Sequence, residues 1–142
     1  MIKKTASAFW QGGIKDGGGT ISTESGVLKD APYGFNARFE GGKGTNPEEL
    51  IGAAHAGCFS MALSLELGKS HMKAESIRTK ATVSLDKDGD GFSITAVHLD
   101  VAVKIPGADR AAFEKAANNA KQGCPVSKLL NAKITMDATL EA

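Results

Sequence analysis

Two cysteines and a histidine are the residues of this chain whose types and spacing could support chemistry. Cys58 lies in the apolar stretch NPEELIGAAHAGCFSMALSLELG, residues 46–68, and His55 precedes it by three residues. Residues three apart share one helix face, so His55 could act as a base toward Cys58, bind a metal with it, or only satisfy a hydrogen bond. Cys58 could also be a small core residue, because buried free cysteine is common. Metal binding is the weakest of these interpretations, since the two cysteines and three histidines form no CxxC or HxxxH spacing.

The second cysteine, Cys124, stands in the stretch QGCPVSKLL directly before Pro125. Proline is favoured at the first position of a helix, which places the sulfur beside free backbone N–H groups at the positive end of the helix dipole. Such a position lowers a thiol pKa. Local physics alone therefore predicts that Cys124 is the better nucleophile, although a cysteine at this position could also be an indifferent N-cap.

The start of the long helix predicts different roles for two neighbouring glutamates, Glu48 and Glu49. With Pro47 at the first helical position, Asn46 becomes the N-cap and Glu49 the third residue, which together predict a variant capping box. Glu48 is not needed for that cap. It is either a solvated first-turn acid or a residue available for another task.

The long helix is apolar on most of its sides, which is typical of a helix packed by a sheet on one face and by another helix on the opposite face. Small residues from Gly52 to Gly57 would allow a second helix to approach closely, yet the chain offers no other long helix of matching apolarity. Pairing with the same helix of a second subunit is the simple solution. We therefore expect a homodimer.

The remaining elements form runs of strands and helices. Residues 3–10, 19–28 and 33–41 alternate as short strands, the last with Phe35, Ala37 and Phe39 facing inward and Asn36 and Arg38 facing outward. Alternation in residues 74–86 and 91–105 predicts an antiparallel hairpin. Asp109 is expected to cap the next helix, which has four residues on one face: Phe113, Ala116, Ala117 and Ala120. Pro125 is expected to begin a short helix, and a last strand alternates at Ile134, Met136, Ala138 and Leu140. This order predicts one α+β domain spanning residues 1–142.

The stretch DKDGDG, residues 86–91, matches the opening of an EF-hand calcium loop. The twelfth loop position should be a bidentate glutamate and is Val97, and the flanking residues alternate as strands do. We therefore expect a hairpin turn, in which Asp and Gly supply the required backbone dihedrals.

Composition limits the partners and the compartment. Seventeen basic and sixteen acidic side chains leave a net charge of +1, which gives no electrostatic reason to expect nucleic acid or an anionic membrane as a partner. Glu66 interrupts the most lipid-like stretch, Leu63–Leu67, and MIKKTASAFW lacks the apolar core of a secretory signal. The sequence favours a cytoplasmic protein, in which two cysteines are more often reactive or metal-binding than a permanent disulfide.

Three longer segments resemble the OsmC/Ohr family, and its OsmC branch of osmotically inducible thiol peroxidases in particular. They are YGFNARFEGGKGTNPEELIGAAHAGCFSMALSLELG, VSLDKDGDGFSIT and NAKQGCPVSKLL, and the resemblance covers essentially the whole chain in order. It implies a small α+β homodimer with long central helices under wrapped sheets and active sites at the subunit interface. It also implies reduction of organic hydroperoxides, and more weakly of hydrogen peroxide, with a cysteine pair and without a metal or prosthetic group.

Matched to the family motifs, Cys58 corresponds to the peroxidatic thiol, Cys124 to the resolving thiol, Arg38 to the catalytic arginine and Glu48 to the glutamate. The family order of the cysteines disagrees with the local ranking above; we follow the family, because an arginine and burial in a dimer could activate Cys58. The placement of the arginine differs between the two branches. The histidine of AAHA, His55, fits the OsmC branch without a chemical role that the sequence reveals.

The resemblance implies a complete redox cycle. The Cys58 thiolate attacks a peroxide oxygen, Arg38 stabilises the thiolate and the peroxide oxygens, and Glu48 holds the guanidinium. Cys124 then condenses with the sulfenic acid to a disulfide, and a thiol or dithiol reductant resets the protein, which would protect against oxidative and osmotic stress. Two other functions compete: a dimer that binds an apolar ligand, and a cysteine hydrolase with His55 as the base.

Helix geometry bears on how such a site is assembled. Glu48 and Cys58 are ten residues apart, so at ~1.5 Å per residue they are about 15 Å apart along one straight helix. We expect a composite site, in which Cys58 of one chain faces Glu48 and Arg38 of its partner.

Overall fold

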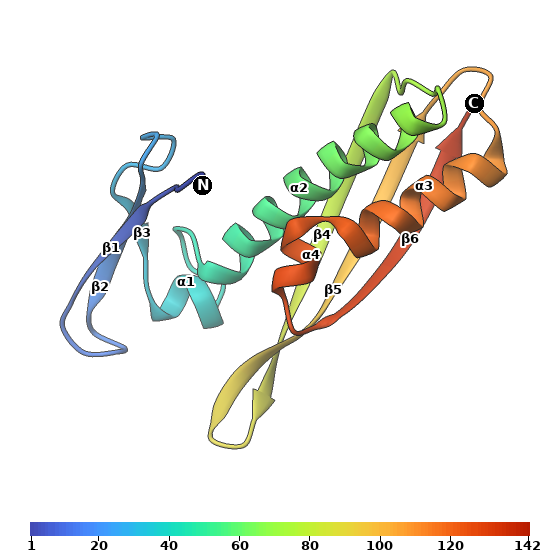
Figure 1. Ribbon diagram of the computed structural model, residues 1–142. Coiled ribbons are helices and arrows are strands. Elements are labelled where there is room, and N and C mark those ends of the chain that lie inside the picture. The colour runs from blue at the N-terminus through green and yellow to red at the C-terminus, as the bar shows by residue number, and fades with distance from the viewer. The chain divides into compact units, whose positions relative to one another are not determined.

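Ten elements follow one another along the chain, which the computed structural model describes from Met1 to Ala142 (Figure 1). They belong to two compact units, residues 1–50 and 51–142. The elements are β1 (Ala6–Gln11), β2 (Gly18–Thr23), β3 (Ala31–Tyr33), α1 (Phe35–Phe39), α2 (Pro47–Lys69), β4 (Ser76–Asp88), β5 (Gly91–Lys104), α3 (Arg110–Gly123), α4 (Pro125–Leu129) and β6 (Lys133–Glu141). The predicted α+β class is confirmed, whereas the single domain over residues 1–142 stays a prediction.

The first unit is built on a small antiparallel sheet in the order β1-β2-β3. β1 pairs with β2 from Ala6 opposite Thr23 to Gln11 opposite Gly18. Trp10 and Tyr33 meet edge to face with ring centroids 5.5 Å apart, so an aromatic contact holds the two outer strands to one another. The two longer strands overlap the segments predicted from alternation, and each extends one residue beyond its segment, β1 to Gln11 and β2 to Gly18.

The third predicted strand, residues 33–41, is wrong in its centre, because Phe35–Phe39 form the helix α1. The alternation of Phe35, Ala37 and Phe39 fits a helix as well, since Phe35 and Phe39 are one turn apart and their ring centroids lie 5.0 Å from one another. Five residues are too few to separate a period of 2 from one of 3.6. Ala37 is buried as expected. Arg38 projects from a helix instead of from the outward face of a strand.

The second unit carries a three-stranded sheet in the order β4-β5-β6. β4 and β5 form the predicted hairpin, with Asp88 opposite Gly91 and Gly89 at a φ of 59° in the turn. The turn interpretation of residues 86–91 is therefore confirmed. β6 is the predicted last strand, but it pairs with β5 in parallel, so α3 and α4 form the crossover between the two strands.

The core of the second unit lies between this sheet and the helices α2 and α3, which cover the same face (Figure 1). α2 buries five residues at helical spacing: Gly52, His55, Phe59, Leu63 and Leu67. α3 buries all four predicted residues and is capped by Asp109, whose carboxylate accepts a hydrogen bond from the backbone N–H of Ala111 at 3.0 Å. The positions of both cysteines follow from this packing.

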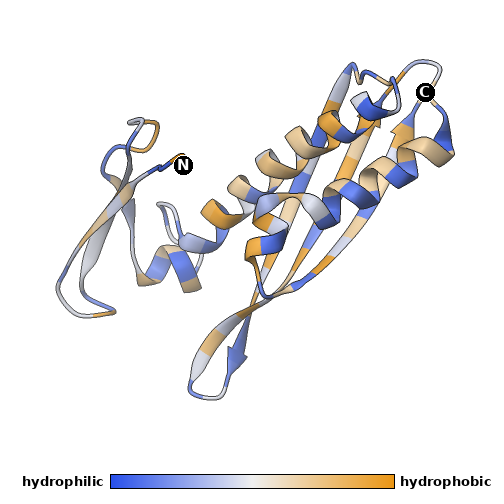
Figure 2. Cartoon of the chain, viewed as in Figure 1, coloured by the Kyte–Doolittle hydropathy of each residue, from blue (hydrophilic) through white to orange (hydrophobic).

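The opposite face of α2 is also apolar, and Figure 2 shows hydrophobic colouring along most of the helix. Met61 and Leu65 on that face are 78% and 64% exposed. By length and hydropathy alone, α2 is the one helix that could cross a membrane; the core helix of a water-soluble domain meets the same criterion, which makes this a weak indication. Its packing on β4 supports the interpretation as a core helix: a Cβ built on Gly52 would lie 3.4 Å from Val83.

Candidate active site

The two cysteines, 66 positions apart in the sequence, meet in the second unit. Their sulfur atoms lie 3.0 Å apart, and both are free thiols. Cys58 is on α2, and Cys124 stands where α3 ends and α4 begins, so its N–H donates to the carbonyl of Ala120 and its own carbonyl accepts from Lys128. The contact therefore depends on how two helices pack against one sheet. At this separation a disulfide needs only a small movement of either side chain.

The two thiols differ in access and in acidity. Cys124 is fully buried, whereas Cys58 is partly exposed. Burial raises the pKa of Cys58, and the hydrogen bond with Cys124 raises it further. Burial also acts to raise the pKa of Cys124, but hydrogen bonding from Cys58, Ser127 and Val126 together outweighs it and lowers that pKa. The local ranking predicted from the helix start, with Cys124 the more acidic thiol, holds within this unit.

A groove of about 610 Å³ opens on Cys58. Its walls are mainly apolar and come from α2 and from α3 with the residues that follow it; they include Met61, Ala62, Leu65, Ala120 and Pro125. A small apolar molecule in this groove would reach the Cys58 sulfur before the buried sulfur of Cys124. Access and acidity therefore favour different thiols.

The contacts of His55 do not fit the role of a base for Cys58. Its side chain is fully buried, and its Nε2 lies 2.7 Å from the hydroxyl of Ser127 on α4. Its Nδ1 is buried without a hydrogen-bond partner, and burial lowers the pKa of the imidazole. Sequence reasoning missed Ser127; the signal was its position three residues after Cys124, where an N3 side chain faces the helix start.

Arg38 and Glu48 form a bidentate ion pair in the first unit. Nε of Arg38 lies 2.8 Å from Oε1 of Glu48, and Nη2 lies 3.2 Å from Oε2. The guanidinium is on α1 and the carboxylate is in the first turn of α2, where the helix dipole favours negative charge. The structure thus brings the four predicted site residues together as two pairs, one in each unit.

At the start of α2, Glu48 and Glu49 have different partners, as expected. Oδ1 of Asn46 accepts a hydrogen bond from the N–H of Glu49 at 2.7 Å, which confirms Asn46 as the cap. The Glu49 carboxylate accepts from the hydroxyl of Thr45 at 2.8 Å, which adds a partner that the capping-box prediction did not include. Glu49 therefore stabilises the helix start, and Glu48 is left to bind Arg38.

Arg38 also lines an aromatic hollow of about 210 Å³ in the first unit. Its other walls are mostly aromatic or aliphatic and include Trp10, Ile14, Tyr33, Phe35 and Phe39. The guanidinium carbon lies 5.1 Å from the centroid of the Phe39 ring, a cation–π distance. The ion pair therefore has an apolar surface beside it.

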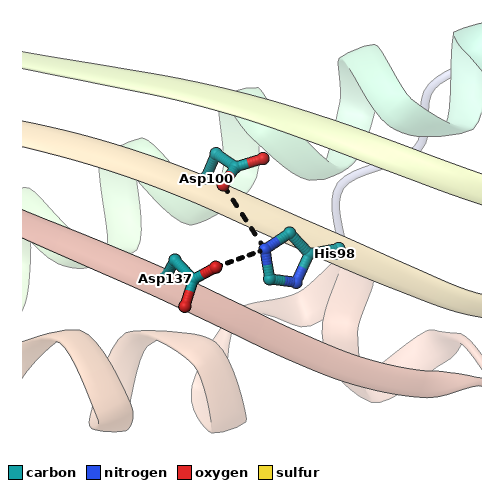
Figure 3. Close-up of side chains that lie close together, drawn as sticks. All are labelled: His98, Asp100 and Asp137. Carbon is teal, nitrogen blue, oxygen red and sulfur yellow. Dashed lines mark hydrogen bonds and ion pairs between the residues drawn. The ribbon is translucent and has the colours of Figure 1, made fainter.

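A second polar cluster lies in the β4-β5-β6 sheet (Figure 3). Nε2 of His98 is 3.0 Å from Asp137 and 3.4 Å from Asp100, while Nδ1 is 2.6 Å from the hydroxyl of Thr135. The three groups could in principle hold a cation. Both aspartates are exposed and already face the imidazole, and Lys80 is opposite Asp100 in the sheet, so the cluster is explained as a solvated group of polar side chains in mutual contact.

The chain is similar to known proteins over its whole length. The family model described as OsmC-like protein matches residues 40–139. The chain is 58% identical over 141 residues to Peroxiredoxin OsmC of Escherichia coli, covering 99% of each protein. It is 30% identical over 124 residues to the organic hydroperoxide resistance protein OhrB of Bacillus subtilis, covering 87% of this chain and 89% of that protein.

Solved structures agree with this assignment. The crystal structure of OhrB of Bacillus subtilis superposes with a TM-score of 0.67 at 30% identity, covering 96% of this chain and 98% of that one. An OsmC-like protein of Vibrio cholerae superposes with a TM-score of 0.76 at 19% identity, covering 97% and 99%, and so shows the shared fold. The thiol pair, the Arg38–Glu48 pair and the elements that carry them thus occur in a chain that belongs to the OsmC-like protein family.

Proposed function

We propose that the protein is a thiol peroxidase that reduces organic hydroperoxides, and hydrogen peroxide more weakly. The observation that carries the proposal is the pair of free thiols 3.0 Å apart beside an apolar groove. One thiol can be oxidised by a peroxide in the groove, and the other is close enough to capture the product. The printed names of the relatives, a peroxiredoxin and an organic hydroperoxide resistance protein, support this chemistry.

Cys58 is the thiol that attacks the peroxide, because it opens on the groove and Cys124 is buried. Its thiolate forms an S–O bond to one peroxide oxygen while the O–O bond breaks, and the alkoxide leaves and takes up a proton to become an alcohol. Cys58 is oxidised to the sulfenic acid, and the peroxide is reduced.

Cys124 resolves this intermediate. Its thiolate attacks the Cys58 sulfur, the S–S bond forms, the S–O bond breaks, and hydroxide leaves to become water. A thiol or dithiol reductant then regenerates both thiols by exchange. Prompt capture matters because a sulfenic acid left exposed to peroxide proceeds to the irreversible sulfinic form.

Arg38 supplies the positive charge that this chemistry requires. We assign to it the stabilisation of the Cys58 thiolate and of the departing oxygen, because a guanidinium offers several donors in one plane. Glu48, bound through two oxygens, fixes the direction of the guanidinium. The match of both residues to the family motifs supports these roles, and the raised pKa of Cys58 within its own unit is the reason that a cation is needed.

The apolar surfaces beside both pairs favour an organic substrate. The groove at Cys58 and the hollow at Arg38 are lined mainly by aliphatic and aromatic side chains. Burying the organic group of a hydroperoxide there is favourable by about 25 cal/mol per Å² of apolar surface. Hydrogen peroxide has no such group and should bind less well.

A cytoplasmic homodimer is the assembly that we propose. The exposed apolar face of α2 supports the dimer, because a helix face with Met61 and Leu65 in water is better covered by a second copy. In the dimer, Cys58 of one chain faces Arg38 and Glu48 of the other. The spacing of Glu48 and Cys58 along one helix supports that arrangement.

The contacts of His55 weaken the alternative of a cysteine hydrolase. A general base needs to reach the nucleophile within hydrogen-bonding distance, and the one hydrogen bond of the His55 ring is made to Ser127. An apolar-ligand-binding protein would explain the groove but gives no reason for two thiols in contact.

A peroxide-consumption assay with a dithiol reductant tests the proposal. We expect catalytic consumption of cumene hydroperoxide at a higher kcat/KM than of hydrogen peroxide, and no consumption by Cys58→Ser. Absence of consumption with reversible binding of cumyl alcohol would favour the binding protein, and ester hydrolysis that survives Cys124→Ser would favour the hydrolase.

A further inference from the structure

The segment that follows Cys124 has few contacts of its own to hold it in place. The short helix α4 has no fully buried residue, and five residues are too few for a helix that is stable by itself. The backbone bonds at Cys124, to Ala120 and from Lys128, join neighbours in the sequence and do not reach α2. Val126 and Leu130 pack only partly against the core. The direction in which the chain leaves α3, and with it the placement of the Cys124 sulfur, therefore depends on side-chain contacts with α2.

Two hydrogen bonds join α2 to this segment. The sulfur atoms of Cys58 and Cys124 lie 3.0 Å apart. Nε2 of His55 lies 2.7 Å from the hydroxyl of Ser127. His55 precedes Cys58 by three residues on α2, and Ser127 follows Cys124 by the same number at the start of α4, so the two bonds are about one helical turn apart. Two such bonds fix the angle between the segments as well as their separation, which one bond alone does not do.

The surroundings of His55 make its bond a specific one. The side chain is fully buried on the core face of α2, together with Phe59 and Leu63. Burial lowers the pKa of the imidazole, so the ring is neutral and one nitrogen carries the proton. A proton on Nδ1 would be a buried donor without a partner, which is rarer and more costly than an unused acceptor. The proton is therefore on Nε2, and His55 donates to the hydroxyl oxygen of Ser127.

This bond matters most after Cys58 has been oxidised. The thiol contact exists only while Cys58 is reduced, because an oxygen on the Cys58 sulfur takes the place of the hydrogen bond between the two thiols. The bond from His55 to Ser127 involves neither sulfur, so oxidation leaves it intact. It then remains to join α2 to the segment of Cys124 while resolution competes with a second molecule of peroxide.

We propose that His55 and Ser127 are positioning residues for the resolving step, because their hydrogen bond keeps Cys124 within reach of the Cys58 sulfenic acid. The proposal rests on the proposed function and keeps its roles, with Cys58 as the attacking thiolate. In this step the Cys124 sulfur bonds to the Cys58 sulfur, the S–O bond breaks, and the oxygen leaves with both protons as water. Misplacing a reacting group by about 1 Å can cost on the order of 10²-fold in rate.

Loss of the bond should affect one half of the reaction and not the other. Peroxide reaches Cys58 from the groove, and neither His55 nor Ser127 is part of the groove walls. The first oxidation of Cys58 should therefore keep its rate. Capture by Cys124 should slow, and more Cys58 should proceed to the sulfinic acid.

The test compares Ser127→Ala, which removes the bond, with Ser127→Thr, which keeps a hydroxyl. Each protein is cycled with cumene hydroperoxide and dithiothreitol, and the Cys58 sulfinic acid formed per turnover is measured by peptide mass spectrometry. We expect about a tenfold rise in Ser127→Ala and a value near the parent in Ser127→Thr, with the rate constant of the first oxidation within about twofold of the parent in both. An unchanged sulfinic yield in Ser127→Ala overturns the proposal.

Thr79→Val is the matched control for a general loss of stability. The Thr79 hydroxyl lies 2.8 Å from that of Ser60 on α2, so this variant also removes one hydroxyl that binds α2, but from β4 instead of α4. It should lower the unfolding free energy and leave the sulfinic yield near the parent value. The same rise in Thr79→Val and Ser127→Ala would mean that core stability controls over-oxidation, and would reject the proposal.

Substitutions of His55 test the donor side of the bond. The amide nitrogen of glutamine can occupy the place of Nε2, whereas that of the shorter asparagine cannot. His55→Gln should therefore keep the parent sulfinic yield, and His55→Asn should raise it as Ser127→Ala does. If Ser127→Ala does not fold, this pair decides: equal yields in the two His55 variants reject the role of the bond.

A measurement without peroxide separates this proposal from the proposed function. The Cys58–Cys124 disulfide is equilibrated with reduced and oxidised dithiothreitol, and the equilibrium constant gives the effective concentration of one thiol at the other. Ser127→Ala should lower this constant by about tenfold, and Thr79→Val should keep it near the parent value. An equal constant in Ser127→Ala and the parent overturns the proposal even if peroxide is consumed. A lowered constant in a protein that consumes no peroxide supports the positioning role and rejects the peroxidase function alone.

Discussion

The Arg38–Glu48 pair and the Cys58–Cys124 pair are held by different kinds of structure. The first joins residues ten positions apart and depends on a short helix and the first turn of the next. The second joins residues 66 positions apart and depends on the packing of two helices on a sheet. Local structure positions the charge, and the core positions the sulfur, so the two pairs should respond differently to mutation.

The largest effect is expected at the cysteines. Cys58→Ser should lower peroxide turnover by on the order of 10³-fold or more, as for removal of a nucleophile. Cys124→Ser should give about one turnover and then accumulate sulfinic acid on Cys58, because no resolving thiol remains. Peptide mass spectrometry after peroxide treatment checks both; a sulfinic acid on Cys124 in the parent protein would reverse the assignment of roles.

The next largest effect is expected at the guanidinium. Arg38→Ala should raise the pKa of Cys58 and lower kcat/KM by about 10²–10³-fold, as for loss of a group that stabilises developing charge. Arg38→Lys keeps the positive charge but lacks the planar group of donors, so its kcat/KM should lie between those of the parent protein and Arg38→Ala. Alkylation rates of Cys58 from pH 5 to 9 measure the shift, and a profile that all three proteins share would exclude the role.

Mixing subunits tests whether the charge and the sulfur come from different chains. Cys58→Ser and Arg38→Ala proteins should each be inactive, yet a mixed dimer should regain about half of the parent activity, because one site then carries both lesions and the other carries neither. Differently tagged subunits allow the mixed dimer to be isolated. A confirmed mixed dimer without activity would place both residues of one site in one chain.

A smaller effect should separate the two glutamates. Glu48→Gln should lower kcat/KM by about tenfold, since the Arg38 guanidinium loses its partner. Arg38 is 39% exposed, so unfolding free energy should change by less than about 1 kcal/mol. Glu49→Gln keeps the contact with Thr45 and should leave activity near the parent value. Equal losses in both variants would contradict the division of labour at this helix start.

The smallest effect is expected in the pH dependence of stability. Burial lowers the pKa of His55 below its ordinary value of 6.5, so the unfolded chain binds this proton first as the pH falls. The contribution of neutral His55 to the unfolding free energy is therefore fully present above pH 6.5 and is lost as the pH falls below that value. Between pH 7 and 5, the parent should lose on the order of 1 kcal/mol more than His55→Gln. Urea unfolding at both pH values provides the comparison; parallel losses would mean that His55 does not contribute.

Sequence reasoning predicted the elements with long, regular patterns. Residues 76–104 alternate over two strands, and Phe113, Ala116, Ala117 and Ala120 repeat at helical spacing, so the hairpin and α3 were predictable. Residues 35–39 were not, because a segment of five residues fits both periods. The parallel pairing of β6 could not be predicted either. Alternation indicates which side chains of a strand face the core, but it does not indicate which strand lies beside it.

The site was predictable in its parts and not in its contacts. The family motifs singled out Cys58, Cys124, Arg38 and Glu48, and the capping argument explained why Glu48 is free for Arg38. The bond between His55 and Ser127 spans 72 positions and leaves no trace in local spacing. The sequence left open whether His55 acts on the cysteine one turn away or only satisfies a hydrogen bond, and the structure places its ring against the hydroxyl of Ser127 on α4.

The parallel pairing of the last strand sets an order in which the protein can be completed during synthesis. β6 ends at Glu141, whose carbonyl accepts from Ile105, and the strand supplies one edge of the sheet under both cysteine-bearing helices. The first 50 residues leave the ribosome long before it, and domains generally fold as they emerge. The thiols therefore cannot acquire their final surroundings until residues 133–141 have been synthesised. Free chains that end before Lys133 should expose both cysteines to a maleimide reagent, whereas chains that include residues 133–141 should protect Cys124.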